Sequence, residues 1–138
     1  MLSCLIGLSA PDVGVPSTGT LTVNISQLRS DAGQVGILVF NAASGFPGDP
    51  GQAVAKAMVS PTGRTCNYAF ALGPGRYAVA IMHDENANNE LDTNMLGIPT
   101  EGYGFSRDAS GWFGPPSFDS AAINFSGDAM GITMRMNY

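Results

Sequence analysis

Hydrophobic and polar residues alternate along two stretches near the ends of this chain. In segment 20–28, the apolar Leu21, Val23 and Ile25 alternate with polar residues, and segment 131–138 alternates in the same way. A period of two residues is typical of a β-strand that buries one face. Both segments are therefore expected to be strands that line a core.

Three further segments have the character of strands. Segment 34–41 is almost continuously apolar, which predicts a central strand covered on both faces. Segments 65–72 and 76–83 alternate on either side of Gly73-Pro74-Gly75, a strong turn signal, so we expect them to form a hairpin. The side chains expected in the core of that hairpin are Tyr68, Phe70, Leu72, Val79 and Ile81.

Other parts of the chain follow different rules. Asp49 followed by Pro50 resembles a helix N-terminus, which predicts a short helix over residues 50–58. Residues 84–120 show little periodicity, so we expect a long loop that holds most of the aromatic side chains. With a weak strand near 121–125, the chain predicts an all-β fold. The expected architecture is a single antiparallel β-sandwich domain over residues 20–138, with one short helix and a long aromatic loop.

Composition and charge narrow the range of partners. The net charge is −5, and the six Lys and Arg residues are scattered singly. A phosphate backbone is held by clustered basic residues, so we expect no nucleic-acid partner. An acidic chain rich in Asn is compatible with divalent cations. No stretch beyond the N-terminus approaches the ~18 apolar residues that could span a membrane, so we expect no membrane span in the mature domain.

The N-terminal segment suggests export. The first ten residues, MLSCLIGLSA, are apolar and end in small residues, which is typical of the later part of a signal peptide. We expect residues 1–19 to be a signal-peptide remnant and linker, and the domain to be periplasmic or extracellular. Two alternatives stay open: an apolar terminal strand packed on the domain, and a lipidated Cys4. Cys4 and Cys66 could form a disulfide if both are retained.

A loop after the second of the two hairpin strands has the spacing of a calcium site. Oxygen-bearing side chains stand at every second position, namely Asp84, Asn86, Asn88, Glu90 and Asp92. Calcium takes six to eight oxygen ligands, and an EF-hand loop offers them at this spacing. Position 12 of that scheme is Met95 instead of Glu, so a further ligand would come from Glu101, Glu85 or Asp108. The alternative is a loop of Asx-turns that binds no metal.

His83 precedes this loop directly. A transition metal could recruit it, but a lone histidine that ends an apolar strand is more often packed or hydrogen-bonded. We therefore expect a structural histidine.

Aromatic side chains concentrate in the segment that follows the loop. They are Tyr103, Phe105, Trp112, Phe113 and Phe118. Exposed aromatics on a rigid scaffold can recognise a ligand or a protein partner. Alternatively, they fold back as a second small core that covers one edge of the sandwich. The two roles can coexist.

The sequence does not predict an enzyme. Its sole histidine is not accompanied by a Gly-x-Ser-x-Gly nucleophile elbow, and no phosphate-binding or dinucleotide-binding glycine motif occurs. A pair of catalytic carboxylates needs one raised pKa, and nothing in the polar, Asn-rich loop suggests one.

Several segments together resemble a bacterial family of exported proteins, the domain of unknown function 2141. The matching stretches are Gly33–Asn41, Gly45–Pro47, Leu72–Ala80, His83–Asn86, Leu91–Asn94, Gly97–Ser106 and Phe113–Phe118. The resemblance implies an immunoglobulin-like or transthyretin-like β-sandwich at a periplasmic or outer-surface location. The segment 84–92 is also similar to calcium loops in β-sandwich repeats of bacterial adhesins, although Ala87 and Asn89 stand where those loops commonly have Gly. The family has no assigned activity.

Two functions from different classes follow from these observations. The first is a non-enzymatic binding or assembly module of the cell envelope, which self-associates or binds an envelope protein through the aromatic segment and exposed strand edges. The second is a periplasmic carrier that holds a small hydrophobic ligand. A large internal apolar pocket would favour the carrier.

Overall fold

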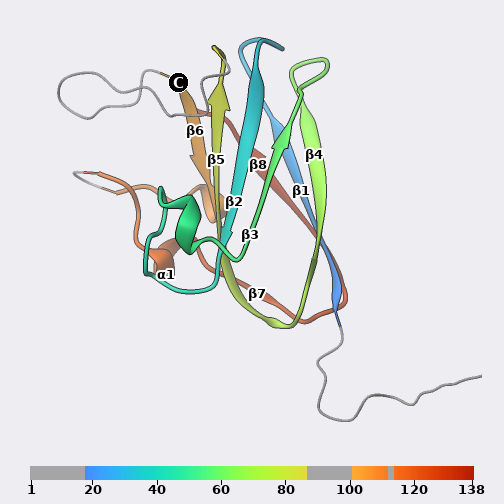
Figure 1. Ribbon diagram of the computed structural model, residues 1–138, viewed down its shortest axis with the longest axis vertical. Coiled ribbons are helices and arrows are strands. Elements are labelled where there is room, and N and C mark those ends of the chain that lie inside the picture. The colour runs from blue at the N-terminus through green and yellow to red at the C-terminus, as the bar shows by residue number, and fades with distance from the viewer. Residues whose placement is uncertain (1–17, 87–100, 112–113) are drawn as a thin grey trace, which may run out of the picture.

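The protein is a sandwich of two β-sheets (Figure 1). The computed structural model describes residues 18–86, 101–111 and 114–138. A three-stranded sheet has the order β4 (Cys66–Leu72), β1 (Gly19–Ser26), β8 (Ala129–Arg135). A five-stranded sheet has the order β3 (Ala55–Val59), β2 (Gln34–Phe40), β5 (Gly75–Asp84), β6 (Gly102–Phe105), and β7 (Ile123–Phe125) also pairs with β5. The predicted all-β sandwich is confirmed.

The strand pairing is antiparallel with one exception. Strand β1 pairs with β4 in antiparallel and with β8 in parallel, so that Leu21 lies opposite both Phe70 and Met130. The predicted antiparallel sandwich holds apart from this one parallel pair. Alternation along a strand indicates which face is buried but is the same in both pairing directions.

The main core lies between the two sheets and follows the predicted alternation. Leu21, Val23 and Ile25 of β1 are buried against Val35, Ile37 and Val39 of β2. The other face of β2 is also covered at Phe40, which is fully buried in a second cluster described below. Strand β2 therefore has both faces covered at this end, as its continuous apolar run predicts.

Strands β4 and β5 do not form the predicted hairpin. The chain reverses at Gly73-Pro74, where the Tyr77 hydroxyl donates to the Gly73 carbonyl over 2.8 Å, but it also crosses from one sheet to the other. A turn signal shows that the chain reverses, and it does not show which neighbour each strand will pair with. Phe70, Leu72, Val79 and Ile81 are nevertheless buried as expected.

Tyr68 departs from the expected burial. Its position on β4 shares a face with Phe70, yet its side chain is 42% exposed. The reason is that β4 is an edge strand, so the side chain faces the open side of the sandwich, where its ring lies 4.8 Å from that of Phe70.

The helix predicted over 50–58 is only one turn long. The cap is as expected, because the Asp49 carboxylate accepts the Gly51 N–H over 2.9 Å and a 3₁₀ turn covers Pro50–Gln52. The following residues form β3, where Ala55, Ala57 and Val59 pack against the core. The alternation of apolar and polar residues along β3 is hard to recognise in the sequence because two of its core-facing residues are alanines. Pairing with β2 overrides the helix propensity of alanine.

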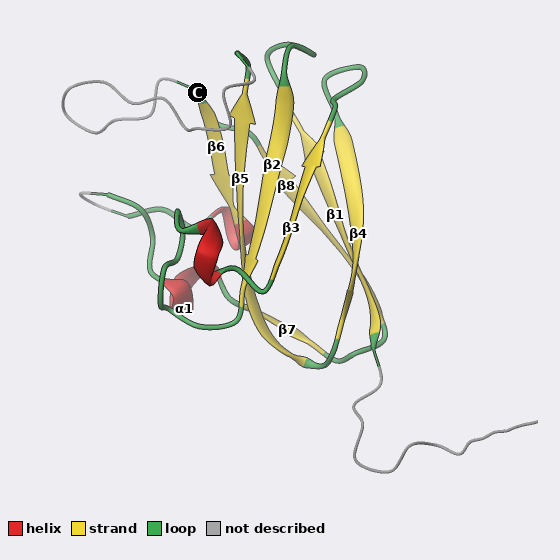
Figure 2. Ribbon diagram, viewed as in Figure 1, coloured by secondary structure: helices red, strands yellow, loops and turns green. Residues whose placement is uncertain are grey.

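The described parts of the region 84–120 contain secondary structure where a loop was expected. They contain β6, a 3₁₀ turn at Ser106–Asp108 (η2) and the short helix α1 (Phe118–Ala121). Figure 2 shows these turns gathered with the Pro50–Gln52 turn beside the five-stranded sheet. No helix in the described residues is long and apolar enough to cross a membrane.

Candidate functional site

The end of the five-stranded sheet carries a cluster of buried polar residues. Strand β5 ends with His83 and Asp84, which are 0% and 1% exposed, and Glu101, just before β6, is also buried. His83 pairs with Gly102 across the two strands, so Asp84 and Glu101 each lie one position beyond that pair. The Glu101 carboxylate accepts the backbone N–H of Glu85 over 3.0 Å. Residues 16 positions apart in the sequence thus meet at one sheet end.

Glu85 is fixed by an ion pair. The Arg29 guanidinium donates to both carboxylate oxygens of Glu85, with Nε at 3.0 and 3.1 Å, and Ser30 donates to one of them over 3.0 Å. The hydrogen bond from Arg29 is the main reason why the pKa of Glu85 lies below its usual value. The same bond raises the pKa of Arg29.

His83 is a structural residue, as expected. Its Nε2 atom donates to the Ala32 carbonyl over 2.7 Å, and its Nδ1 atom lies 2.6 Å from the hydroxyl of Tyr138. That hydroxyl also accepts the backbone N–H of Arg29 over 3.0 Å, and the Arg29 guanidinium stacks 4.5 Å from the centre of the Tyr138 ring. Burial raises the pKa of Tyr138, so the hydroxyl keeps its proton near neutral pH.

The structure places only part of the predicted calcium loop. Asp84 is buried and Asn86 is exposed, whereas Asn88, Glu90 and Asp92 lie outside the described residues. Of the proposed additional ligands, Glu101 lies, like Asp84, one position beyond the His83–Gly102 pair, while Asp108 instead forms a 3.3 Å ion pair with Arg135. No group of three His, Cys, Asp or Glu side chains within the described ranges is arranged to hold a metal ion.

Two of the five predicted aromatic residues belong to a second core. Phe118 is buried and Phe105 is partly buried on the outer face of the five-stranded sheet, in a cluster with Phe40, Ala78 and Ala121. The cluster centres on Phe46, which sequence reasoning missed: its ring lies 5.4 Å from that of Phe40 and 6.1 Å from those of Phe105 and Phe118. We call this cluster the aromatic cover, and it is the arrangement expected if the aromatic segment covers the sandwich.

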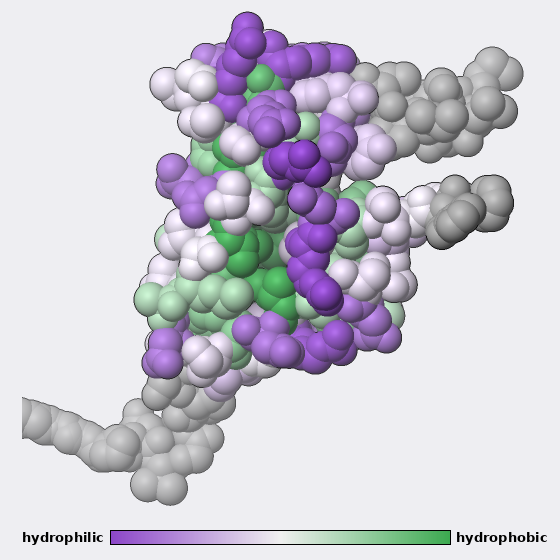
Figure 3. Space-filling view, turned by 180° about the vertical axis from the view of Figure 1, so that it is seen from behind, coloured by the Kyte–Doolittle hydropathy of each residue, from purple (hydrophilic) through white to green (hydrophobic). Residues whose placement is uncertain are grey.

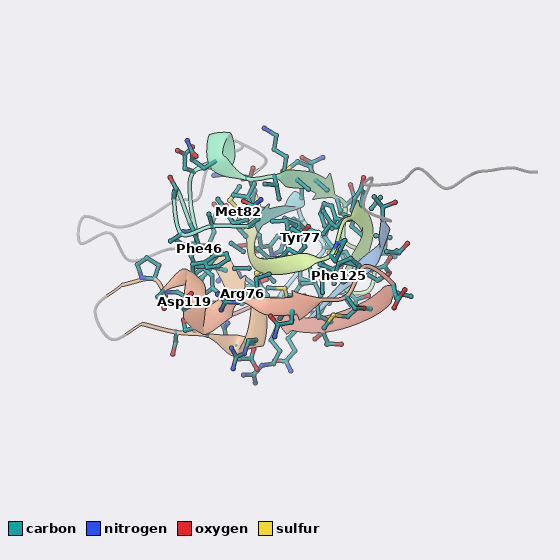
Figure 4. All side chains as sticks on the ribbon, turned by 90° about the horizontal axis from the view of Figure 1, so that it is seen from below. Phe46, Arg76, Tyr77, Met82, Asp119 and Phe125 are labelled. Atoms are coloured by element: carbon teal, nitrogen blue, oxygen red, sulfur yellow. The ribbon has the colours of Figure 1, made fainter. Side chains whose placement is uncertain are left out.

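Figure 4 separates this cover from the main core. Seen from below, Tyr77 and Phe125 lie together between the sheets, with ring centres 6.2 Å apart, whereas Phe46, Arg76 and Asp119 lie to one side of them. Arg76 forms a 3.2 Å ion pair with Asp119 of the cover and lies 5.6 Å from the centre of the Phe118 ring.

A buried serine attaches the cover to the sheet. The Ser106 hydroxyl accepts the backbone N–H of Val79 over 2.9 Å and donates to the Ala121 carbonyl over 2.5 Å. It therefore connects β5, η2 and α1 at a point that is 1% exposed. Serine is common in loops, and no feature of the sequence pattern singles this one out.

Beside the cover, a row of apolar side chains crosses the outer face of the five-stranded sheet. Strand register aligns Met58, Gly36, Met82 and Tyr103 across four strands. Met58 is 42% exposed, and Met82 and Tyr103 are partly exposed. A Cβ atom at Gly36 would lie 3.3 Å from both methionine side chains, which shows that they close over the glycine. We call these four residues the methionine row.

Trp112 and Phe113, the other two predicted surface aromatics, lie outside the described residues.

Three further hydrophobic residues of the main core are only partly buried. Ile123, Met130 and Ile132 are partly buried against the main core. Seen from behind, the molecule has hydrophobic surface down its middle, with a hydrophilic border on one side (Figure 3).

A hollow opens between β3 and β4. It has a volume of about 250 Å³ and is lined by Val59, Ser60, Thr62, Thr65, Cys66 and Asn67. Drug-sized ligands occupy pockets of roughly 300–1,000 Å³ with mainly apolar walls, so this hollow is small and polar for that purpose. Burial raises the pKa of the Cys66 thiol, which keeps it protonated and unreactive.

The chain matches one protein family in sequence. The family described as an uncharacterized protein conserved in bacteria, domain of unknown function 2141, matches residues 23–133. Comparisons with curated proteins and with solved structures found no significant match. The matched range spans the sandwich from β1 into β8 and includes the polar cluster and the aromatic cover.

Proposed function

The chain belongs to this bacterial family, the domain of unknown function 2141, and we propose that it is a non-enzymatic binding or assembly module exported to the cell envelope. The observation that carries the proposal is the combination of a filled interior with apolar side chains left on the surface. Val35, Ile37, Val39 and Val79 are 0% exposed between the sheets, whereas Met58 is 42% exposed on the outer face.

This distribution supports surface recognition over the carriage of a small ligand. A carrier needs an apolar cavity that encloses its ligand. Here the space between the sheets is filled by side chains, and the hollow beside Cys66 is polar and open. Flexible methionines on an exposed face adapt to the shape of a protein partner, and Tyr103 adds an aromatic anchor to the row.

The chemistry of the titratable residues supports a role without catalysis. Both ring nitrogens of His83 are committed to structural hydrogen bonds, with Ala32 and with Tyr138. A general base needs a ring nitrogen that can reach a substrate. Glu85 is held ionised by Arg29, and Cys66 is held neutral by burial, so neither has the pKa of an acid-base catalyst or of a nucleophile near neutral pH.

The buried carboxylates support a calcium-stabilised loop as part of the same proposal. Asp84 and Glu101 are brought together at the sheet end, and Asn86 follows directly. In this proposal they hold the loop 84–92 in place, with calcium bound by Asp84, Asn86, Asn88, Glu90 and Asp92.

A crosslinking experiment in cells tests the proposed function. A photoreactive amino acid replaces Met58 in the methionine row, and a matched control carries it at Thr133, an exposed residue of β8 in the other sheet. Cell fractions are collected before illumination. We expect the chain in the periplasmic or surface fraction and an adduct with an envelope protein or a second copy at position 58 alone. A cytoplasmic chain, or equal adducts at both positions, would contradict the proposal.

A further inference from the structure

We propose that strand β4 pairs with β4 of a second copy around a two-fold axis at Ala69, so that two three-stranded sheets join into one of six strands. The inference rests on the proposed assembly function and names the partner as the chain itself. Its site is a strand edge, separate from the methionine row.

Strand β4 has an open edge. In the described part of the chain it pairs with β1 alone, over seven residues. The other edge strand of this sheet, β8, has η2 against it, Arg135 pairs with Asp108, and Asn137 just beyond it forms a bridge with Tyr103 of β6. Strand β4 lies near β3, but in the described residues the two belong to different sheets and do not pair. The unpaired groups of β4 are therefore the ones available to another strand.

The edge of β4 lacks the usual protection against pairing. Edge strands are commonly kept apart by a charged residue, a proline or a bulge. The sequence of Cys66–Leu72, CNYAFAL, contains neither a charge nor a proline, and its register with β1 runs without interruption. The edge strand β3, by contrast, is five residues long and carries Lys56.

The pattern of β4 suits pairing with itself. In an antiparallel pair centred on Ala69, Tyr68 of one copy lies opposite Phe70 of the other, on the face that lines the core. Aromatic pairs across strands stabilise a sheet. The pairing would also cover Tyr68, which is 42% exposed although it lies on the inward face of the strand. On the outward face, the exposed Asn67, Ala69 and Ala71 are small and present no obstacle.

The net negative charge of each chain predicts that the β4–β4 dimer is weak. Each chain has a net charge of −5, so two copies repel at long range, and the uncharged edge avoids adding to this repulsion. One pair of seven-residue strands is a small contact. Interfaces below about 1,200 Å² are typical of transient complexes. We therefore expect a dimer that forms at high micromolar concentration and strengthens at higher salt, which screens the repulsion.

Sedimentation of the full chain over a wide concentration range tests the pairing. The variant Ala69→Lys places two cations opposite each other at the two-fold axis. It also brings the net charge closer to zero, which weakens the repulsion between whole chains. Any loss of dimer therefore comes from the local repulsion at the β4 edge. Thr133→Lys makes the same change of charge on β8 and is the control. We expect Ala69→Lys to raise the dimer Kd at least about tenfold and Thr133→Lys to leave it unchanged or lower. A monomer under all conditions, or equal effects of both variants, would overturn the inference.

A disulfide trap tests the register even if the lysine variant folds poorly. Residues directly opposite in an antiparallel pair have Cα atoms about 4.5–5.5 Å apart, within the range of a disulfide. Ala69→Cys should therefore give a dimer that is covalent under oxidation. In the same register, two copies of residue 71 are offset by four positions, about 13 Å, so Ala71→Cys should not crosslink. Equal crosslinking of both variants, or none in Ala69→Cys, would overturn the inference. An adduct with an envelope protein at position 58 in a strictly monomeric protein would refute only the β4 pairing, and the proposed function would stand.

Discussion

The Nδ1 atom of His83 lies 2.6 Å from the hydroxyl oxygen of Tyr138. The carbonyl of Ala32, on the other side of the ring, can only accept a hydrogen bond, so Nε2 is the donor, and in the tautomer that carries its proton on Nε2 the Nδ1 atom is an acceptor. The Tyr138 hydroxyl therefore donates to His83 while it accepts from the backbone of Arg29. A continuous chain of hydrogen bonds joins residues 29, 138, 83 and 32 at one end of the sandwich.

Removal of the Tyr138 hydroxyl should destabilise the protein. Tyr138→Phe keeps the ring but leaves the buried Nδ1 of His83 without its donor, and an unsatisfied buried acceptor costs about 1–3 kcal/mol. Chemical denaturation measures the free energy of unfolding. Tyr68→Phe is the control, because Tyr68 is 42% exposed, and it should change stability by less than about 0.5 kcal/mol. Equal stabilities of the two variants would show that the His83 hydrogen bond contributes nothing.

The Arg29–Glu85 ion pair should make stability depend on pH in the acidic range. The pKa of Glu85 is lower in the folded protein than in the unfolded chain. Its contribution is therefore fully present above the unfolded pKa, about 4.3, and disappears as the pH falls through the lowered folded pKa.

The variant Arg29→Gln tests this dependence. At pH 7 we expect it to have a lower denaturation midpoint than the parent, and we expect the difference to narrow below about pH 4 as Glu85 is protonated in both proteins. Lys56→Gln removes an exposed cation elsewhere and should show no such narrowing. A difference that stays constant from pH 7 to pH 3 would contradict the role of Glu85.

The aromatic cover should contribute to folding stability. Phe118 packs on Phe46 and is 7% exposed, so Phe118→Ala should cost about 3–5 kcal/mol, the usual range for a buried phenylalanine. Limited proteolysis should then cut the segment around α1 faster than in the parent. Unchanged melting and protease resistance would show that the cover is not part of the cooperative fold.

Trp112 and Phe113 give the matching test of recognition. If they are a binding surface, the double variant Trp112→Ser/Phe113→Ser should fold with nearly the parent's stability and lose its adduct with the partner, because exposed aromatics contribute more to interfaces than to folding. A loss of several kcal/mol in unfolding free energy would instead assign them to the cover.

Calcium should stabilise the protein if the loop 84–92 binds it. A site with a Kd near 0.1 mM gains about 1.4 kcal/mol at 1 mM calcium. We expect the melting temperature to rise with calcium and fall with a chelator, and Asp84→Ala to abolish the response. Because Asp84 is buried, its replacement can also weaken the fold. The melting temperature of each variant is therefore compared with and without calcium, and Asp92→Ala serves as a second variant. No response in the parent would remove the metal from the proposal.

The sequence predicted most strands but not their partners. Alternation around Val23 and the continuous run around Ile37 indicated both strands and their buried faces, because burial depends on local pattern. The crossing at Gly73-Pro74 and the parallel β1–β8 pair could not be predicted, since they depend on contacts between residues far apart in the chain.

The sequence predicted only the part of the candidate site that is formed by residues close together in the chain. The spacing from Asp84 to Asn86 is visible in the sequence, but the meeting of Asp84 with Glu101 depends on the pairing of β5 with β6. Phe46 and Ser106 were missed for a similar reason: an isolated phenylalanine after a glycine and a serine after a strand have ordinary sequence contexts. Their roles follow from elements that pack on them from elsewhere.

The parallel pairing of β1 with β8 has a consequence for the order in which the protein can fold. Thr20 lies opposite Ala129, so β1 is synthesised well before β8, the strand that it pairs with. Until then, β1 has only β4 beside it, and one flank of the strand that carries Leu21 and Val23 stays open. Such long-range pairing slows folding. A nascent chain that stops before Ala129 should therefore remain sensitive to protease, whereas a chain that extends past Arg135 should form the protected sandwich.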